Sequence, residues 1–456
     1  MINRRDALKT LGATMLAAAA PAPLLALDAR AKKSARTDRP NLDAAIRAAR
    51  WIRKSRLTTE HGVVWPADPN DEKSVGTTLY SGSPGVILFL LELHAATGDA
   101  SYLADASAAA DHLVATMPSG DKRAEHGLYE GIAGHAFALD LAWRQTGRGA
   151  YRDAATRCID IIKREAIEKD GGVQWNDTTD IISGAAGTGL ALLWWAGRAN
   201  DPAARALAAK SGRRLLDLST PAPGGLMWRV DPVFARVMPN FSHGTAGIAY
   251  FLASLHQHTG DRALLDAAMA GATHLQTIAK KDDDTCTIYH HDGDGQQLFY
   301  LGWCHGPVGT ARLFQRLSQI TKSSNWRAWV RRSARGISTS GVPEQRTPGF
   351  WNNASQCCGN AGVAEFFLDL HRSLGDSVYL DYTRRVNGDL LRRATPDGDG
   401  IKWVQAEHRV KPELLIAQTG YMQGAAGMGT WLLHMDGFEN RRKPLVVLPD
   451  NPWSDG

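Results

Sequence analysis

A short glycine turn recurs seven times along this chain, and each copy is followed by a largely apolar stretch. The turn has the form Gly-x-x-Gly, and successive copies are 49 to 65 residues apart. A period of this length indicates a repeat architecture, in which copies of one structural unit stack and bury a shared core. The copies begin at Gly82, Gly131, Gly184, Gly244, Gly306, Gly359 and Gly424.

The segments between the copies have apolar residues at helical spacing, as in 263–279 and 326–340. The stretch after each turn is apolar nearly all round, which is typical of a buried helix. We therefore predict an all-α fold, an α/α toroid of seven inner and seven outer helices whose glycine turns all lie at one mouth. Glycine is expected there because it allows unusual backbone angles and close approach of neighbouring chains.

The predicted toroid spans residues 41–440, between a linker at 32–40 and a C-terminal tail at 441–456. Residues 1–31 resemble a twin-arginine signal peptide, with Arg4 and Arg5 ahead of an alanine-rich stretch and a small-x-small cleavage site ending at Ala31. A chance arginine pair ahead of an ordinary secretory signal is the alternative. We expect a periplasmic or secreted protein, exported by the twin-arginine route, with no stable membrane anchor once the signal is removed.

The composition of the chain narrows the range of possible binding partners. The chain is 44% hydrophobic and 22% charged, which is typical of a globular protein. Its 52 basic and 47 acidic residues are well mixed along the sequence, so nothing indicates a nucleic-acid partner.

The two residues before each turn should occupy equivalent places around the mouth, and these places hold three of the five cysteines. Cys304 stands in the fifth copy, Cys357 and Cys358 in the sixth, and His243 in the fourth. Three thiolates can fill three corners of a zinc tetrahedron and leave the fourth open. A disulfide from Cys304 to either neighbour is the competing interpretation, because exported proteins usually pair their cysteines.

The sevenfold turn, together with "SHGTAG", "GWCHG" and "CCGNAG" in the fourth to sixth copies, resembles the lanthionine synthetase C-like family over roughly residues 40–440. The resemblance implies an α/α toroid that binds one Zn²⁺ and adds a cysteine thiol to a dehydroamino acid in a peptide. It implies Cys304 and Cys357 as metal ligands, and Cys358 where the family commonly has histidine. It also implies His243 as the acid/base residue and Asp180 as its acidic partner.

Three functions from different classes remain open. The first is zinc-dependent formation of a thioether in a peptide, or addition of a thiol to a related electrophile. The second is an exported, zinc-stabilised protein that binds or assembles peptides without turnover. The third is a sugar-active α/α barrel, suggested by 14 tryptophans, although glycosidases need paired carboxylates rather than thiolates.

Overall fold

The computed structural model describes residues 39–118 and 123–453. The chain divides into two compact units, Met1–Arg39 and Pro40–Gly456, and the second holds nearly all of the described residues. The predicted signal peptide lies outside the described residues, as does most of the predicted linker. No helix within the described ranges is both long enough and apolar enough to cross a membrane.

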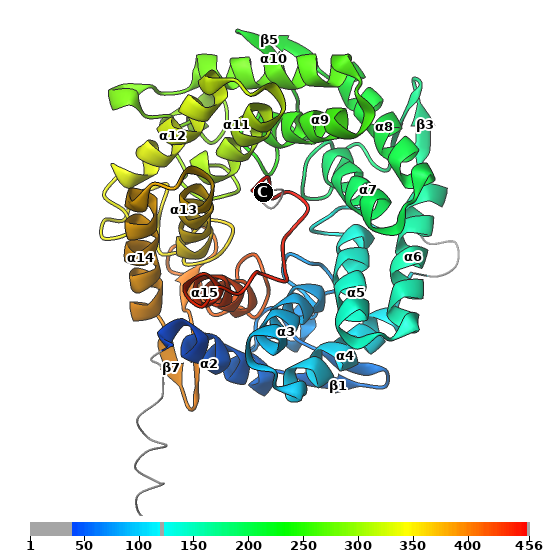
Figure 1. The fold of residues 1–456 in the computed structure, drawn as a ribbon, viewed down its shortest axis with the longest axis vertical. Coiled ribbons are helices and arrows are strands. Elements are labelled where there is room, and N and C mark those ends of the chain that lie inside the picture. Colours follow the sequence, from blue (N-terminus) through cyan, green and yellow to red (C-terminus); the bar gives the residue numbers. More distant parts are fainter. Residues whose placement is uncertain (1–38, 119–122, 454–456) are drawn as a thin grey trace, which may run out of the picture. The chain divides into compact units, whose positions relative to one another are not determined.

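Helices of the second unit form a closed ring in two layers (Figure 1). The described residues include seven inner helices, which are α3 (Ser83–Thr97), α5 (Ile132–Thr146), α7 (Ala185–Ala199), α9 (Thr245–Thr259), α11 (Pro307–Thr321), α13 (Asn360–Leu374) and α15 (Ala425–Glu439). They also include seven outer helices, which are α2 (Pro40–Lys54), α4 (Ala100–Ala115), α6 (Gly149–Arg164), α8 (Pro202–Asp217), α10 (Arg262–Ile278), α12 (Ser324–Ser338) and α14 (Ser377–Arg392). The predicted all-α toroid is therefore confirmed.

The first and last repeats close the ring. Helix α2 packs against α15, the last helix, and α15 also packs against α3 (Figure 1). Burial separates the two layers: in α3 every residue from Ser83 to Leu93 is buried, whereas α12 buries one face that includes Trp326 and Trp329. An inner helix has neighbours on every side, so its sequence is apolar nearly all round.

The first glycine of each turn is the N-cap residue of an inner helix, with φ between −98° and −160°. These values are open to any residue, so the expectation of unusual backbone angles is wrong. Close approach is the actual requirement. A Cβ on Gly244 would lie 1.6 Å from the carbonyl oxygen of Met238, and one on Gly309 would lie 1.9 Å from that of Trp303.

A closed circle of backbone hydrogen bonds joins the seven turns and explains why they approach so closely. Each turn donates an amide N–H to a carbonyl of the next turn around the ring, at 2.8 to 3.3 Å, and the seventh donates back to the first. The carbonyl acceptors are Tyr129, Ile182, Ser242, Cys304, Cys357, Met422 and Tyr80. Each is the first of the two residues before a turn, so the predicted equivalence of these places is confirmed.

Short antiparallel hairpins decorate the ring without forming a larger sheet among the described residues. Four follow outer helices, and in each the second strand leads into a tryptophan, namely Trp65, Trp175, Trp228 and Trp403. The last three donate their indole N–H to a carbonyl thirteen residues earlier, near the end of the preceding outer helix. The strands are β1 (Leu57–Thr59), β2 (Gly62–Val64), β3 (Ile167–Lys169), β4 (Gly172–Gln174), β5 (Thr220–Ala222), β6 (Gly225–Met227), β7 (Thr395–Asp397), β8 (Gly400–Lys402), β9 (Gln405–Ala406) and β10 (Leu415–Ile416).

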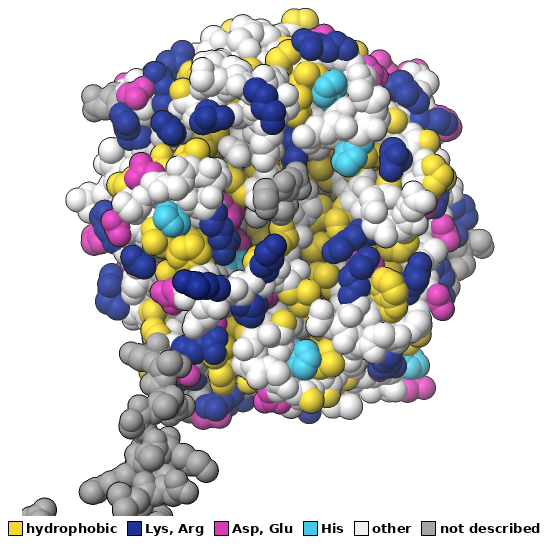
Figure 2. Space-filling model, in the orientation of Figure 1, with side chains coloured by type: hydrophobic (Ala, Val, Ile, Leu, Met, Phe, Trp, Pro, Cys, Tyr) yellow, Lys and Arg dark blue, Asp and Glu magenta, His cyan; other side chains and the backbone are white. Residues whose placement is uncertain are grey.

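The chain after α15 turns back into the centre of the ring, where it is drawn in red in Figure 1. Glu92 of α3 anchors its start: this buried carboxylate pairs with Arg442 and accepts the amide N–H groups of Leu445 and Val446, each at 2.8 Å. Figure 2 shows the face on which the tail lies, where hydrophobic side chains line a central hollow and Lys and Arg side chains surround it. Within the described part of the predicted tail, Val446 and Asp450 are buried inside the toroid.

Close to Glu92, the buried His434 makes the stability of the fold depend on pH. Burial lowers its pKa, but hydrogen bonds and charge from Glu365 and Glu92 outweigh burial and raise it to about 9. Because the folded protein then holds the proton more tightly than the unfolded chain, the stabilisation is complete below about pH 6.5 and is lost as pH rises through 9. Urea titrations should show the free energy of unfolding falling over that range. His434→Gln should flatten the fall, and equal slopes in both proteins would contradict the assignment.

Candidate active site

A pocket of 220 Å³ opens at the mouth of the ring, over the turns of the fifth and sixth repeats. Its lining includes all three cysteines singled out by the sequence, together with His243. The four side chains lie just before the N-termini of neighbouring inner helices α9, α11 and α13. The circle of hydrogen bonds sets their spacing, since the Cys304 amide donates to the Cys357 carbonyl at 3.3 Å.

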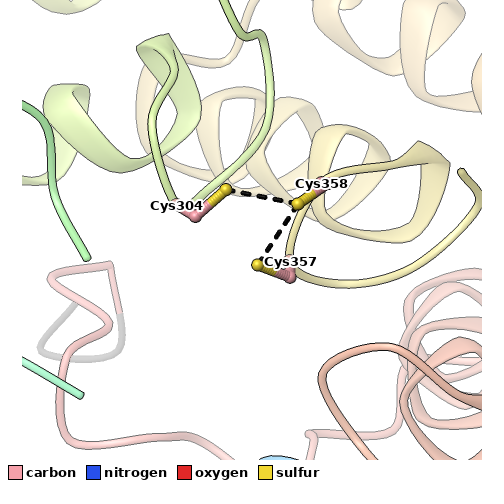
Figure 3. Close-up of side chains that lie close together, drawn as sticks. All are labelled: Cys304, Cys357 and Cys358. Carbon is pink, nitrogen blue, oxygen red and sulfur yellow. Dashed lines mark hydrogen bonds between the residues drawn. The ribbon is translucent and has the colours of Figure 1, made fainter. Parts of the chain in front are cut away.

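The cysteine side chains point toward one another (Figure 3). Cys304 Sγ lies 3.2 Å from Cys358 Sγ, which lies 3.4 Å from Cys357 Sγ, and all three sulfurs lie within 4.8 Å of one another. A disulfide needs about 2.05 Å between sulfurs, so the structure holds them as free thiols. Each residue is at most 7% exposed, and the cluster faces the pocket.

Protons are shared unequally among the three thiols. Hydrogen bonds from Cys304 and Cys358 lower the pKa of Cys357 well below its ordinary value, with smaller contributions from Tyr80 and His243. Burial raises the pKa of Cys304, and hydrogen bonds to its two neighbours raise that of Cys358. Of the three thiols, that of Cys357 is therefore the one that ionises most readily.

His243 and Asp180 form a pair at the edge of the same pocket. His243 Nδ1 lies 2.6 Å from Asp180 Oδ2, and Asp180 Oδ1 accepts the amide N–H groups of Ser183 and Gly184 at 2.9 Å each. Asp180 therefore orients the imidazole and also caps the third turn. Burial lowers the pKa of His243, but the hydrogen bond and charge of Asp180 outweigh burial and raise it.

Two further histidines extend from this pair along the pocket. The ring of His305 lies 5.6 Å from that of His243 and 4.0 Å from that of His290, centroid to centroid. Burial lowers the pKa of His305 well below its ordinary value and that of His290 to about 4, so both rings are neutral. His290 contributes to the wall of the pocket, and the neighbouring His291 is buried.

Other polar residues near the mouth have structural partners. Glu130 accepts a hydrogen bond from Ser183 at 3.0 Å and is exposed, while the hydroxyl of Tyr129 points down into the ring toward Asp450. His135 is buried with Nε2 against the Thr77 carbonyl, and burial lowers its pKa to about 4.

Comparison with models of known families identifies the family to which the chain belongs. The model of the family described as "Lanthionine synthetase C-like protein" matches residues 73–448, which is most of the chain. The chain belongs to the lanthionine synthetase C-like family. The predicted family membership is confirmed. A search of curated proteins finds no match.

Several solved structures are similar to this lanthionine synthetase C-like protein. Nisin cyclase is 15% identical, with a TM-score of 0.60 over 89% of this chain and 95% of its own. The Lin0763 protein from Listeria innocua is 14% identical, with a TM-score of 0.48 over 88% and 99% of the two chains. An inactive variant of the GH76A α-1,6-mannanase of Salegentibacter sp. is 12% identical, with a TM-score of 0.44 over 87% and 98%.

The donor set of this lanthionine synthetase C-like protein fits zinc. Three thiolates are ligands that zinc prefers, and a tetrahedral site with Zn–S bonds of about 2.3 Å places its sulfurs about 3.8 Å apart. The observed separations of 3.2 and 3.4 Å are a few tenths of an ångström shorter. The described residues bring no fourth histidine, cysteine or carboxylate into the group, so a fourth position is left for water or substrate.

Two residues that received no role from the sequence also contact the cluster. The hydroxyl of Tyr80 donates to Cys357 Sγ at 3.3 Å, and the amide of Gln423 donates to Tyr80 at 3.2 Å and to Cys358 Sγ at 3.8 Å. Tyr80 precedes the first turn and Gln423 the seventh, so their equivalent places in the repeat were a signal that pointed to them.

Proposed function

We propose that this protein joins a cysteine thiol to a dehydroamino acid in a peptide, forming a thioether, and that it does so with one bound zinc. The observation that carries the proposal is the convergence of three buried cysteine sulfurs in one pocket with the His243–Asp180 pair. Membership of the lanthionine synthetase C-like family supports this reaction class, as does the likeness of the fold to nisin cyclase.

Cys304, Cys357 and Cys358 would hold the metal, which when bound lowers the pKa of an incoming thiol so that it reacts as a thiolate. Tyr80 and Gln423 support the ligands, because their hydrogen bonds to Cys357 and Cys358 fix the direction of each sulfur.

The pair of His243 and Asp180 handles protons. Addition of a thiol to a dehydroalanine breaks the S–H bond, forms a C–S bond at Cβ and leaves an enolate that takes a proton at Cα, so one group has to accept a proton and return it. His243 suits this role because 35% of its side chain is exposed to the pocket while Asp180 fixes its Nδ1 side.

Arg409 lies in the wall of the same pocket, at the loop between β9 and β10. The enolate carries negative charge on the carbonyl oxygen of the acceptor residue, and an anionic trio of thiolates would repel that charge. A guanidinium in the same pocket attracts it. Arg409 is the one fixed cation among the described residues that line the pocket, and it suits an electrostatic role.

The reaction is tested with a peptide that contains one dehydroalanine and one cysteine. Zinc-loaded protein should consume the free thiol with no change in peptide mass, and a thiol-blocking reagent followed by mass spectrometry then distinguishes product from substrate. Chelator-treated protein provides the control. If zinc-loaded protein binds the peptide yet leaves its thiol free, the alternative of a peptide-binding protein without turnover replaces this proposal.

We further propose export to the periplasm or beyond by the twin-arginine route, on the evidence of Arg4, Arg5 and the small residues ending at Ala31. Replacing both arginines by lysine should leave unprocessed precursor in the cytoplasm, because the pair is the feature that this route reads. Fractionation and the N-terminal sequence of the mature protein measure the outcome. Unchanged export of the double variant would point to an ordinary secretory signal.

A further inference from the structure

Within the ring, the C-terminal segment contacts Trp303, the residue that immediately precedes Cys304. Its Asp450 is 0% exposed, and one carboxylate oxygen, Oδ2, has three partners. Tyr129 donates its hydroxyl at 3.1 Å, Trp303 donates its indole N–H at 3.0 Å, and Arg312 lies at 3.1 Å. Arg312 also donates to the Asp450 carbonyl at 2.8 Å, which fixes the backbone of the segment in the same place.

Two of these partners belong to the turns that form the mouth. Trp303 immediately precedes Cys304, and its backbone N–H donates to the Cys357 carbonyl at 2.8 Å. Tyr129 belongs to the circle of hydrogen bonds as well, and accepts the amide N–H of Tyr80. The rings of Tyr129 and Trp303 contact each other, with centroids 5.1 Å apart. Asp450 therefore holds the indole of Trp303, the residue whose backbone N–H joins the fifth turn to the sixth.

From this geometry we infer that Asp450 is a positioning residue for the cysteine cluster, acting through Trp303. An unpaired buried carboxylate is costly, and here Oδ2 is satisfied by the two aromatic donors and one guanidinium, whereas Oδ1 is buried without a hydrogen-bond partner. With Asp450 in place, the Trp303 ring has one orientation, and Cys304 stays within reach of Cys357 and Cys358. A segment that lies outside the seven repeats thus positions the cysteine cluster.

The decisive variant is Asp450→Ala, which removes the acceptor from both aromatic donors. We expect the zinc dissociation constant to rise about tenfold, within the range of about 10- to 100-fold typical of residues that support metal ligands. In metal-free protein the rate at which iodoacetamide alkylates Cys304 should rise by a similar factor, because the turn that buries the thiol opens more often. Peptide mapping by mass spectrometry measures that rate.

Asp140→Ala is the matched control. Asp140 is 3% exposed and pairs with Arg144 at 2.8 Å on α5. Asp140→Ala therefore removes a buried carboxylate of the same kind, one that makes no hydrogen bond or ion pair to the cysteines or to the described part of the tail. Asp450→Asn keeps an oxygen for the two aromatic donors and should restore most of the zinc affinity. If Asp140→Ala weakens zinc binding and exposes Cys304 as much as Asp450→Ala does, the effect is general destabilisation and the inference is wrong.

Trp303→Phe covers the case in which Asp450→Ala does not fold, because it keeps an aromatic ring and removes the indole donor. Trp303→Phe should reproduce the loss of affinity, and combining it with Asp450→Ala should add nothing further. If the effects of the two substitutions on zinc affinity are fully additive, Asp450 does not act through Trp303 and the inference is wrong. The zinc readout rests on the proposed function, whereas the alkylation readout does not. Wild-type protein without zinc would therefore refute the proposed metal while leaving Asp450 to be judged by alkylation.

Discussion

Cys304→Ala should lose zinc and thioether formation together. Cys304 supplies the one sulfur of the cluster that comes from the fifth repeat, and the two neighbouring cysteines of the sixth repeat cannot hold a tetrahedral ion alone. Loss of a supporting residue typically weakens zinc binding about 10- to 100-fold, so loss of a ligand should cost more than about 100-fold. Metal analysis after dialysis, together with the peptide assay, measures both effects.

Cys158→Ala is the control for that variant. Cys158 is also fully buried, but it lies on outer helix α6 against Met117, and burial raises the pKa of its thiol to about 12. The control should keep one zinc and full activity. If Cys304→Ala retains its zinc, the metal is held at another site.

His243→Ala should separate metal binding from turnover. The imidazole lies outside the group of sulfurs, so the variant should keep its zinc and its fold while the rate of addition falls about 10²- to 10⁴-fold, as for loss of a general acid/base. Asp180→Asn should fall between wild type and His243→Ala. Its carboxamide oxygen can still accept the Ser183 and Gly184 amides, but the charge that raises the pKa of His243 is gone.

His274→Gln provides the comparison for the histidine variant. His274 is a buried histidine of outer helix α10, hydrogen-bonded to the Pro223 carbonyl at 2.8 Å and remote from the pocket lining. The His274→Gln variant should retain the wild-type rate of thiol addition. Full activity in His243→Ala would reject the acid/base assignment and direct attention to His305, the next imidazole along the pocket.

The repeat predicted the fold because its spacing and its helical periodicity depend on local sequence. It also predicted which residues would meet, since equivalent positions in a ring lie at the same height: His243, Cys304, Cys357 and Cys358 all line one pocket. The pairing of His243 with Asp180 followed from the family resemblance, and the structure places them 2.6 Å apart. Their chemical roles stay predictions.

What the sequence did not reveal depends on contacts between distant segments. Asp450 follows the last repeat, and no pattern in the tail indicates that it re-enters the ring and meets Trp303, 147 residues earlier. Tryptophan content suggested a sugar-binding barrel, yet Trp175 and Trp228 are hairpin residues whose indoles bond to outer helices. The repeated Gly-x-x-Trp of those hairpins was a signal for this structural use. The glycine turns were expected both for unusual backbone angles and for close approach of neighbouring chains, and only the steric reason holds.

The proposed function depends most on an open zinc site made of three thiolates. The metal content and metal coordination of protein purified without chelator test this site most directly. We expect one zinc per chain, with X-ray absorption showing three sulfur ligands at about 2.3 Å and one lighter ligand. Treatment with a chelator should then release one equivalent of metal and make Cys304, Cys357 and Cys358 reactive. Protein that holds no zinc and carries a disulfide between Cys304 and either neighbour would contradict the account.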